Sequence, residues 1–227
     1  MSTSETVTEA HDVRMTRALH RLPLFPLQSI VLFPHALLPL HIFESRYRKM
    51  ASDVLATNHL LAISMMLEEE IPGGQPPRVA RVAGVGEIVL AQEMPDGRYN
   101  LVVRGRARIS IDQELPSDEP YRLVTAHEVP DDPSLDASEL TDADASLRAL
   151  VAGLADSIPE GGELLKQVVA AQDSPAALAD VLSAALVVDA PLRQHLLETT
   201  SVYQRLERLS AEVVAMTARI GRQERAN

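Results

Sequence analysis

The residues from which catalytic or metal chemistry would have to be built are few in this chain. It has seven histidines, two lysines and no cysteine. The histidines show neither HxH nor HExxH spacing, and no thiolate can act as a ligand or a nucleophile. Neither Lys49 nor Lys166 follows the glycines of a phosphate-binding loop, and no G-x-S-x-G elbow occurs. We therefore predict no catalytic residue, no metal site and no cofactor, and expect that the protein is not an enzyme.

Three arginines form a candidate nucleic-acid surface. Arg104, Arg106 and Arg108 alternate along a predicted strand, so strand geometry places them on one face. No aromatic residues interleave with them, and the chain has no tryptophan on which a base could stack. A net charge of −11 also disfavours contact with phosphates. We expect a solvated row that is ion-paired to the neighbouring strand at Glu87–Glu93, with RNA binding as the alternative.

The elements that position these residues begin with an uncharged stretch from Leu22 to Phe43. Its length of about 20 residues is typical of a membrane span, but its four prolines forbid a continuous helix. The pattern predicts short buried strands at Ser29–Phe33 and Leu37–Ile42, followed by a helix over Glu44–Asn58. Because the first 20 residues are polar and lack the apolar core of a signal peptide, we expect a disordered lead-in and a cytoplasmic protein.

The next part of the chain alternates with the period of strands. Strands are predicted at Leu60–Leu67, Val79–Met94, Tyr99–Ile111 and Tyr121–Val129, with a loop over Glu68–Pro77. Pro95, Asp96 and Gly97 form a turn by their own chemistry, while Gly84, Gly86 and Gly105 mark bends. Long bent antiparallel strands with one inserted helix indicate a small, partly closed barrel over residues 21–129.

Beyond an acidic linker at residues 130–140, the period changes to 3.6 and predicts a helical bundle over residues 141–227. Capping signals, including Ser174 before Pro175 and Asp189 before Pro191, separate its helices. The fold class is therefore α+β. Helices are predicted at Thr141–Ser157, Glu163–Ala171, Pro175–Val187, Ala190–Thr199 and Val202–Gly221.

The last of these helices is long and amphipathic. Its apolar residues recur at spacings of four and three and form a narrow seam. We expect this seam to dock on its own bundle, and a homodimer formed through it is the alternative. The seam residues are Val202, Leu206, Leu209, Val213, Met216 and Ile220.

The chain carries several motifs, namely Leu22–Leu27 with Phe33–Pro34 and Leu38–Leu40, the hairpin Met94–Gly97 with Gly105–Ser110, and Asp173–Val181. Together they resemble the N-terminal domain of Lon proteases, the LON substrate-binding domain. The run from His41 to Arg48 is similar to stand-alone members that lack the ATPase and protease modules. The resemblance implies that the barrel is a pseudobarrel similar to the PUA fold.

The resemblance also implies a function, which is to bind unfolded or apolar polypeptide, or to act as an adaptor for a protease or chaperone partner. Such binding needs an exposed apolar groove or an open strand edge, with charge nearby to orient the guest. The start of the first helix offers such a surface, and ordinary capping and core packing is the alternative reading of it. Its residues are Phe43, Glu44, Arg46, Tyr47 and Arg48, and Met65 and Met66 are further candidates for a groove lining.

Overall fold

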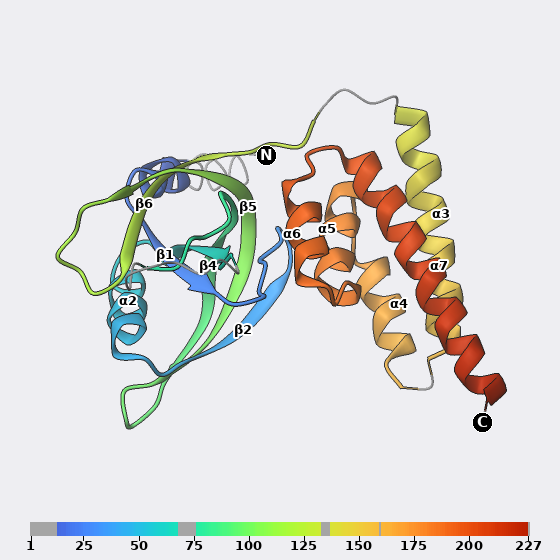
Figure 1. The fold of residues 1–227 in the computed structure, drawn as a ribbon, viewed down its shortest axis with the longest axis horizontal. Helices are drawn as coiled ribbons and strands as arrows, with labels where there is room; N and C mark the ends of the chain where they lie inside the picture. Colours follow the sequence, from blue (N-terminus) through green and yellow to red (C-terminus); the bar gives the residue numbers. More distant parts are fainter. Residues whose placement is uncertain (1–12, 68–75, 133–136, 159, 227) are drawn as a thin grey trace, which may run out of the picture. The chain divides into compact units, whose positions relative to one another are not determined.

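The computed structural model describes residues 13–67, 76–132, 137–158 and 160–226 (Figure 1). The chain divides into two compact units, Met1–Val129 and Pro130–Asn227. We call them the barrel unit and the helical unit. The first is built on strands and the second on helices, so the predicted α+β class is confirmed.

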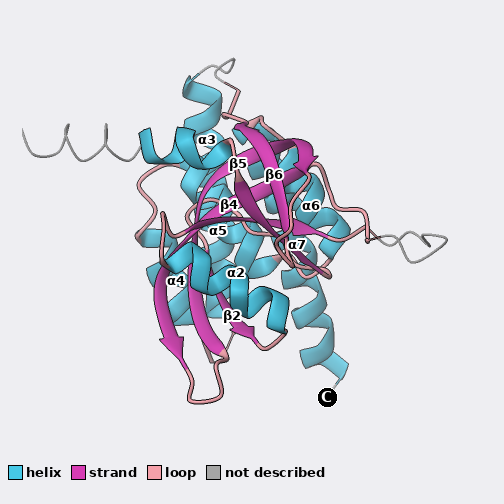
Figure 2. Cartoon of the chain, turned by 90° about the vertical axis from the view of Figure 1, so that its left-hand side faces the viewer, coloured by secondary structure: helices cyan, strands magenta, loops and turns pink. Residues whose placement is uncertain are grey.

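Six strands of the barrel unit form one sheet, in the order β2-β5-β4-β3-β1-β6. β5 is long enough to pair with β2, β4 and β6, and its pairing with β6 closes the sheet into a barrel. The curvature of the long strands is visible in Figure 2. β1 runs parallel to β3, and the other pairs are antiparallel. The strands are β1 (Leu22–Leu27), β2 (Leu37–Ile42), β3 (Leu60–Met65), β4 (Val82–Glu93), β5 (Tyr99–Leu115) and β6 (Arg122–Glu128).

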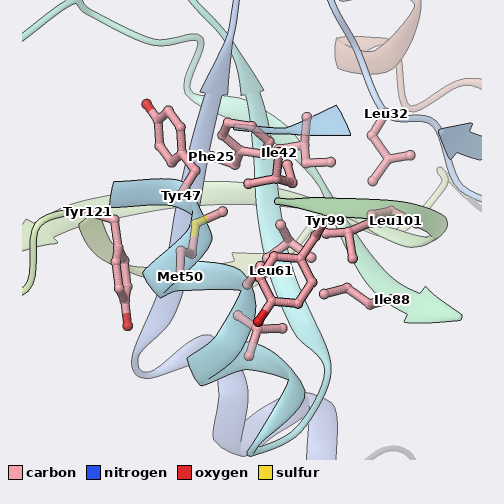
Figure 3. Packing of buried hydrophobic residues seen from close by; sticks show 14 of the residues in the cluster. Phe25, Leu32, Ile42, Tyr47, Met50, Leu61, Ile88, Tyr99, Leu101 and Tyr121 are labelled. Carbon is pink, nitrogen blue, oxygen red and sulfur yellow. The ribbon is translucent and has the colours of Figure 1, made fainter. Parts of the chain in front are cut away.

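Alternate residues of the strands pack into two separate apolar clusters, as the period of two requires. On β3, for example, Leu61 and Ile63 enter one cluster, whereas Leu60 and Ala62 enter the other. Helix α2 (Ser45–Leu55) packs on the first cluster, which Figure 3 shows. A helix over residues 13–19 packs on the second.

Two sequence predictions for this unit were wrong. Residues 13–19 were placed in the disordered lead-in, but they form a helix because Met15, Ala18 and Leu19 share one face and bury it in the second cluster. Residues 1–12 lie outside the described residues. Ser29–Phe33 is not a strand, and the first strand is instead Leu22–Leu27.

The segment between β1 and β2 runs across the sheet at two glycines. A Cβ on Gly105 would lie 1.9 Å from the Phe33 carbonyl oxygen, and one on Gly84 would lie 2.1 Å from the Leu32 oxygen. Gly105 N also donates to Ala36 O at 2.9 Å. These two glycines are therefore places of direct backbone contact, and the predicted irregularity of the strand lies next to them, between Val85 and Gly86.

The helical unit holds five elements in the described part of the chain. α3 starts at Ala137, inside the segment that was predicted to be linker. The two predicted caps are present, since Ser174 Oγ accepts from Ala177 N and Asp189 Oδ2 accepts from Leu192 N. The helices are α3 (Ala137–Asp156), α4 (Gly162–Ala170), α5 (Pro175–Leu186), α6 (Ala190–Glu198) and α7 (Val202–Ala226).

A fully buried arginine on α7 ties the start of this unit to its helices. Arg205 Nη1 donates to Asp131 Oδ1 at 2.7 Å and to Thr199 O at 2.8 Å. Arg205 Nε lies 3.6 Å from Asp180 Oδ1, and Asp180 is itself buried on α5. A buried charge is stable only when it is paired, so these contacts depend on one another.

Gly105→Ala should destabilise the barrel unit, because the new methyl group would collide with backbone that cannot swing away. We expect a loss of about 1–3 kcal/mol in the free energy of unfolding, as for other overpacked sites. The matched control is Gly153→Ala on α3, where a Cβ meets nothing within 4 Å. That change should stabilise its helix by about 0.5–1 kcal/mol. Chemical denaturation measures both, and equal stabilities for the two variants would contradict the close approach at Gly105.

Arg205→Met should remove about 3–5 kcal/mol from the free energy of unfolding of the helical unit, because it leaves Asp180 as a buried charge without its cation. Arg208→Met is the control, since Arg208 lies on the same helix and pairs with Glu212 at the surface. A surface pair contributes only about 0–1 kcal/mol. Thermal unfolding followed by circular dichroism compares the two, and similar melting temperatures would count against a structural role for the buried pair.

A cleft beside the start of helix α2

The barrel unit carries a cleft of about 730 Å³ at the start of α2. We call the lining residues from β2 and the first residues of α2 the first wall, and those from the end of β1, the end of β5 and the segment before β6 the second wall. Figure 3 shows Phe25, Tyr47 and Tyr121, which come from these elements. Its apolar lining includes Leu27, Ile30, Leu40, Phe43, Met66, Pro77, Leu115 and Pro120.

The polypeptide turns from β2 into α2 at Phe43 and Glu44. Glu44 is the N-cap residue with extended backbone, and its carbonyl oxygen accepts from Tyr47 N and Arg48 N. Its side chain makes no capping bond and instead accepts from Arg46 Nε at 3.0 Å. The turn thus leaves the Glu44–Arg46 ion pair at the rim of the cleft.

Phe43 is the most exposed aromatic side chain of the lining. It is 63% exposed, and its ring lies 6.3 Å from that of His41 in a stacked orientation. Tyr47 is different, because it is 7% exposed and its ring lies 4.4 Å from Phe25. Phe43 is therefore free to contact a guest, whereas Tyr47 mainly supports the floor of the cleft.

Four of the five residues predicted for the site line the cleft, and the fifth does not. Arg48 points to the β4–β5 hairpin, where Nη1 donates to Asp96 O at 3.0 Å. Of the two methionines, Met66 lines the cleft and Met65 is not part of its lining. The helical period explains the outcome for Arg48, since it lies one residue beyond Tyr47 and so faces a different direction.

Each charged side chain in the lining of the cleft has a partner of opposite charge. Arg122 Nε donates to Glu114 Oε2 at 2.9 Å, and Glu119 lies 3.5 Å from Lys49 Nζ. With the Glu44–Arg46 pair, these contacts leave the rim charged but compensated. The lining holds three carboxylates against two guanidinium groups, so its charge is largely compensated and one negative charge remains.

Behind the cleft wall, Tyr121 donates a hydrogen bond from its hydroxyl to Asp53 Oδ2 at 2.8 Å. Burial acts to raise the pKa of Asp53, but the hydrogen bonds from Lys49 and Tyr121 outweigh it and hold this pKa below its usual value. Burial, followed by the hydrogen bond to Asp53, raises the pKa of Tyr121. The tyrosine therefore stays neutral and fixes the wall to α2.

Arg104, Arg106 and Arg108 do not form one solvated face of the strand. Arg104 is exposed, but Arg106 is half-buried and pairs with Glu87 at 3.3 Å, as the sequence predicted for this row. Arg108 is 4% exposed, which the prediction missed. The strand has a bulge here, since Val85 pairs with Ala107 and Gly86 with Gly105, which leaves Arg106 as an extra residue. The alternation therefore changes phase, and Arg108, opposite Gly84, does not share the face of Arg104. An RNA surface of three adjacent arginines is thus not formed.

The seam on α7 is mostly used within its own bundle. Val202, Leu206, Leu209 and Val213 are buried in the helical unit, so they are not available to a second chain. Met216 and Ile220 are half-buried, and Ile220 lines a groove of about 580 Å³ between α3 and α7. A homodimer through the full seam, which was the alternative to docking on the bundle, is therefore not supported.

Residues 13–67, 76–132, 137–158 and 160–226 contain no group of three or more His, Asp or Glu side chains that could hold a metal ion. None of the helices in that part of the chain has the length and apolar character needed to cross a membrane.

Sequence reasoning missed the second wall of the cleft. Glu114, Glu119 and Arg122 lie at least 59 residues beyond the end of α2 at Leu55 and reach it only because β5 and β6 close the barrel. The one local signal was Pro120 before a predicted strand, which marks a turn but gives no direction.

Tyr121→Phe tests the hydrogen bond behind the wall, because it removes the hydroxyl and keeps the ring. The lowered pKa of Asp53 stabilises the fold above about pH 4, and this contribution is lost as the pH falls through the folded-state pKa. We expect a loss of about 1 kcal/mol at pH 7 that shrinks toward pH 3, together with a higher Asp53 pKa by NMR. Tyr99→Phe, in the same cluster, is the control, and a pH-independent loss would refute the assignment.

Comparison of the sequence with known proteins assigns this chain to a family. Residues 21–214 match the family model of the ATP-dependent protease La (LON) substrate-binding domain. Lon protease of Rhizobium meliloti is 28% identical over 82% of this chain, and Lon protease of Roseiflexus castenholzii is 30% identical over 83%. The chain spans 23% of the length of each of these two relatives.

Solved structures agree with the sequence matches. The N-terminal domain of a Mycobacterium avium complex Lon protease superposes with a TM-score of 0.68 at 21% identity, covering 86% of this chain and 98% of that one. The Lon N-terminal domain protein of Xanthomonas campestris gives 0.59 at 25% identity, covering 84% and 97%. The first likeness concerns the fold alone, while the family match covers most of the sequence. This chain therefore belongs to the LON substrate-binding domain family.

Proposed function

We propose that this chain binds unfolded or apolar polypeptide segments in the cleft beside α2, as a substrate-recognition or adaptor module without chemistry of its own. The observation that carries the proposal is the exposed ring of Phe43 at the edge of a cleft whose lining combines apolar side chains with ion-paired charges. An exposed aromatic side chain costs free energy in water, and a guest that covers it recovers that cost.

The charges of the cleft favour apolar recognition over electrostatic recognition. Arg46, Arg122 and Glu119 are each engaged with an oppositely charged side chain of the same unit. A guest would have to break these pairs to use the charges, so its affinity should come from buried apolar area. Binding of this kind is only weakly sensitive to salt, because screening acts on charges.

The family supports the class of guest. Its description as a substrate-binding domain of an ATP-dependent protease makes polypeptide the natural ligand. The matched relatives are Lon proteases of which this chain spans 23%. A protease or chaperone partner that receives the bound polypeptide is consistent with an adaptor role for this chain.

Phe43→Ala should weaken binding of a fluorescently labelled, permanently unfolded polypeptide by about tenfold, as expected when an exposed aromatic anchor is removed. Leu90→Ala is the matched control, because Leu90 is 61% exposed on β4 and lies outside the cleft lining. It should bind like the unchanged protein. The measurement is a fluorescence anisotropy titration at low and high salt, with the folded form of the same polypeptide as the reference.

Two results would remove the proposal. One is the lack of binding of the unfolded polypeptide at tens of micromolar protein, where even a weak module should show affinity. The other is an equal loss in the Phe43 and Leu90 variants, which would place binding on the apolar surface in general. Strong weakening by salt would point instead to the charged rim.

A further inference from the structure

Two strand edges at the cleft have no strand partner in the described part of the chain. β2 pairs with β5 alone, so its other edge is open. β1 pairs with β6 only through Leu22–Leu24, which leaves the corresponding edge of Phe25–Leu27 open. Residues of both edges line the cleft. Open edges are where many peptide-binding domains add an extended guest as an extra strand.

On β2, the open edge has a proline at its centre. The hydrogen bond from Gly105 N to Ala36 O shows that the backbone carbonyl of Ala36 points toward β5. Since successive residues of a strand direct their backbone groups to opposite sides, every second residue after Ala36 faces β5. The residues between them, including Pro39 and His41, face the open edge. Pro39 has no N–H, so His41 is the only residue of β2 in the cleft lining that can donate there.

On β1, the open edge also has a proline. Met66 N donates to Leu27 O at 2.9 Å, so the backbone of Leu27 faces β3. Pro26 precedes it by one residue and therefore directs its ring nitrogen to the other, open edge. Proline is tolerated in a strand at such a position, and it blunts the edge against further pairing. Both edges that border the cleft thus have a proline where an incoming strand would need a donor.

We propose that the cleft binds its guest through apolar side chains alone and does not add the guest as a strand. Pro26 and Pro39 set this mode of recognition. The substrate class is then an apolar segment of any backbone conformation, an amphipathic helix included, and the guest's backbone amides make no essential hydrogen bond. This inference rests on the proposed function, since it specifies how the same cleft takes polypeptide.

The test uses two peptides with one apolar sequence, of which one is N-methylated at alternate backbone amides. Side-chain recognition predicts dissociation constants that agree within about twofold, and a similar weakening of both peptides by Phe43→Ala. Strand addition predicts a different result. Each lost amide hydrogen bond would then cost about fivefold in affinity, so the methylated peptide would bind at least tenfold more weakly.

The outcomes separate the two proposals. Binding of the unmethylated peptide with loss of the methylated one would overturn side-chain recognition and leave the proposed function standing. Binding of neither peptide would remove the proposed function, and this inference with it.

A second arm restores a donor to the edge. Pro39→Val should tighten binding of the unmethylated peptide about fivefold and leave the methylated peptide unchanged, because one amide hydrogen bond becomes available. Pro23→Val is the control, since Pro23 lies in β1 but outside the cleft lining. If Pro39→Val binds both peptides as the unchanged protein does, Pro39 does not set the mode of recognition.

Discussion

The barrel unit depends on the direct contact of two backbones where the chain crosses its own sheet. Gly84 and Gly105 have no side chain, so the carbonyl groups of Leu32 and Phe33 rest against the strands. This contact aligns the following residues with β5 and so sets the register of β2. β2 in turn ends at Phe43, directly before α2. The position of one cleft wall therefore follows from two glycines that are not part of the cleft lining.

The two units place their polar groups according to different physical demands. In the helical unit, Arg205 is fully buried and fixed by Asp131 and Asp180, so its charges serve the fold. At the cleft, Arg46 and Arg122 pair near the surface, where ion pairs contribute little to stability. Those surface pairs are better understood as keeping the rim soluble while leaving it only one net negative charge. An apolar floor with a compensated rim is suited to guests that differ in charge.

Interactions between residues close in the sequence predicted much of this fold. The cleft was harder to predict, because residues far apart in the sequence come together in it only when the barrel closes. The turn at Gly97 needs a residue that tolerates a positive φ, and the cap at Ser174 needs only a backbone N–H three residues later. Both features depend on a few consecutive residues, so the sequence predicted them. The apolar periods also gave the order of most elements. Arg108 was misplaced because a bulge at Arg106 changes the alternation of β5, and the position of a bulge depends on the pairing with β4. The second wall, including Arg122, is equally non-local.

The prolines that break the apolar stretch have consequences at each level of the structure. In the sequence they exclude a continuous helix, which leaves extended segments as the way to bury the apolar residues. In the sheet, Pro26 and Pro39 fit because their nitrogens face open edges, where no ladder bond is lost. At the cleft, the same two positions limit pairing by an incoming strand. A surface that must stay apolar and open is thereby protected from edge-to-edge association, while its side chains remain available to a guest.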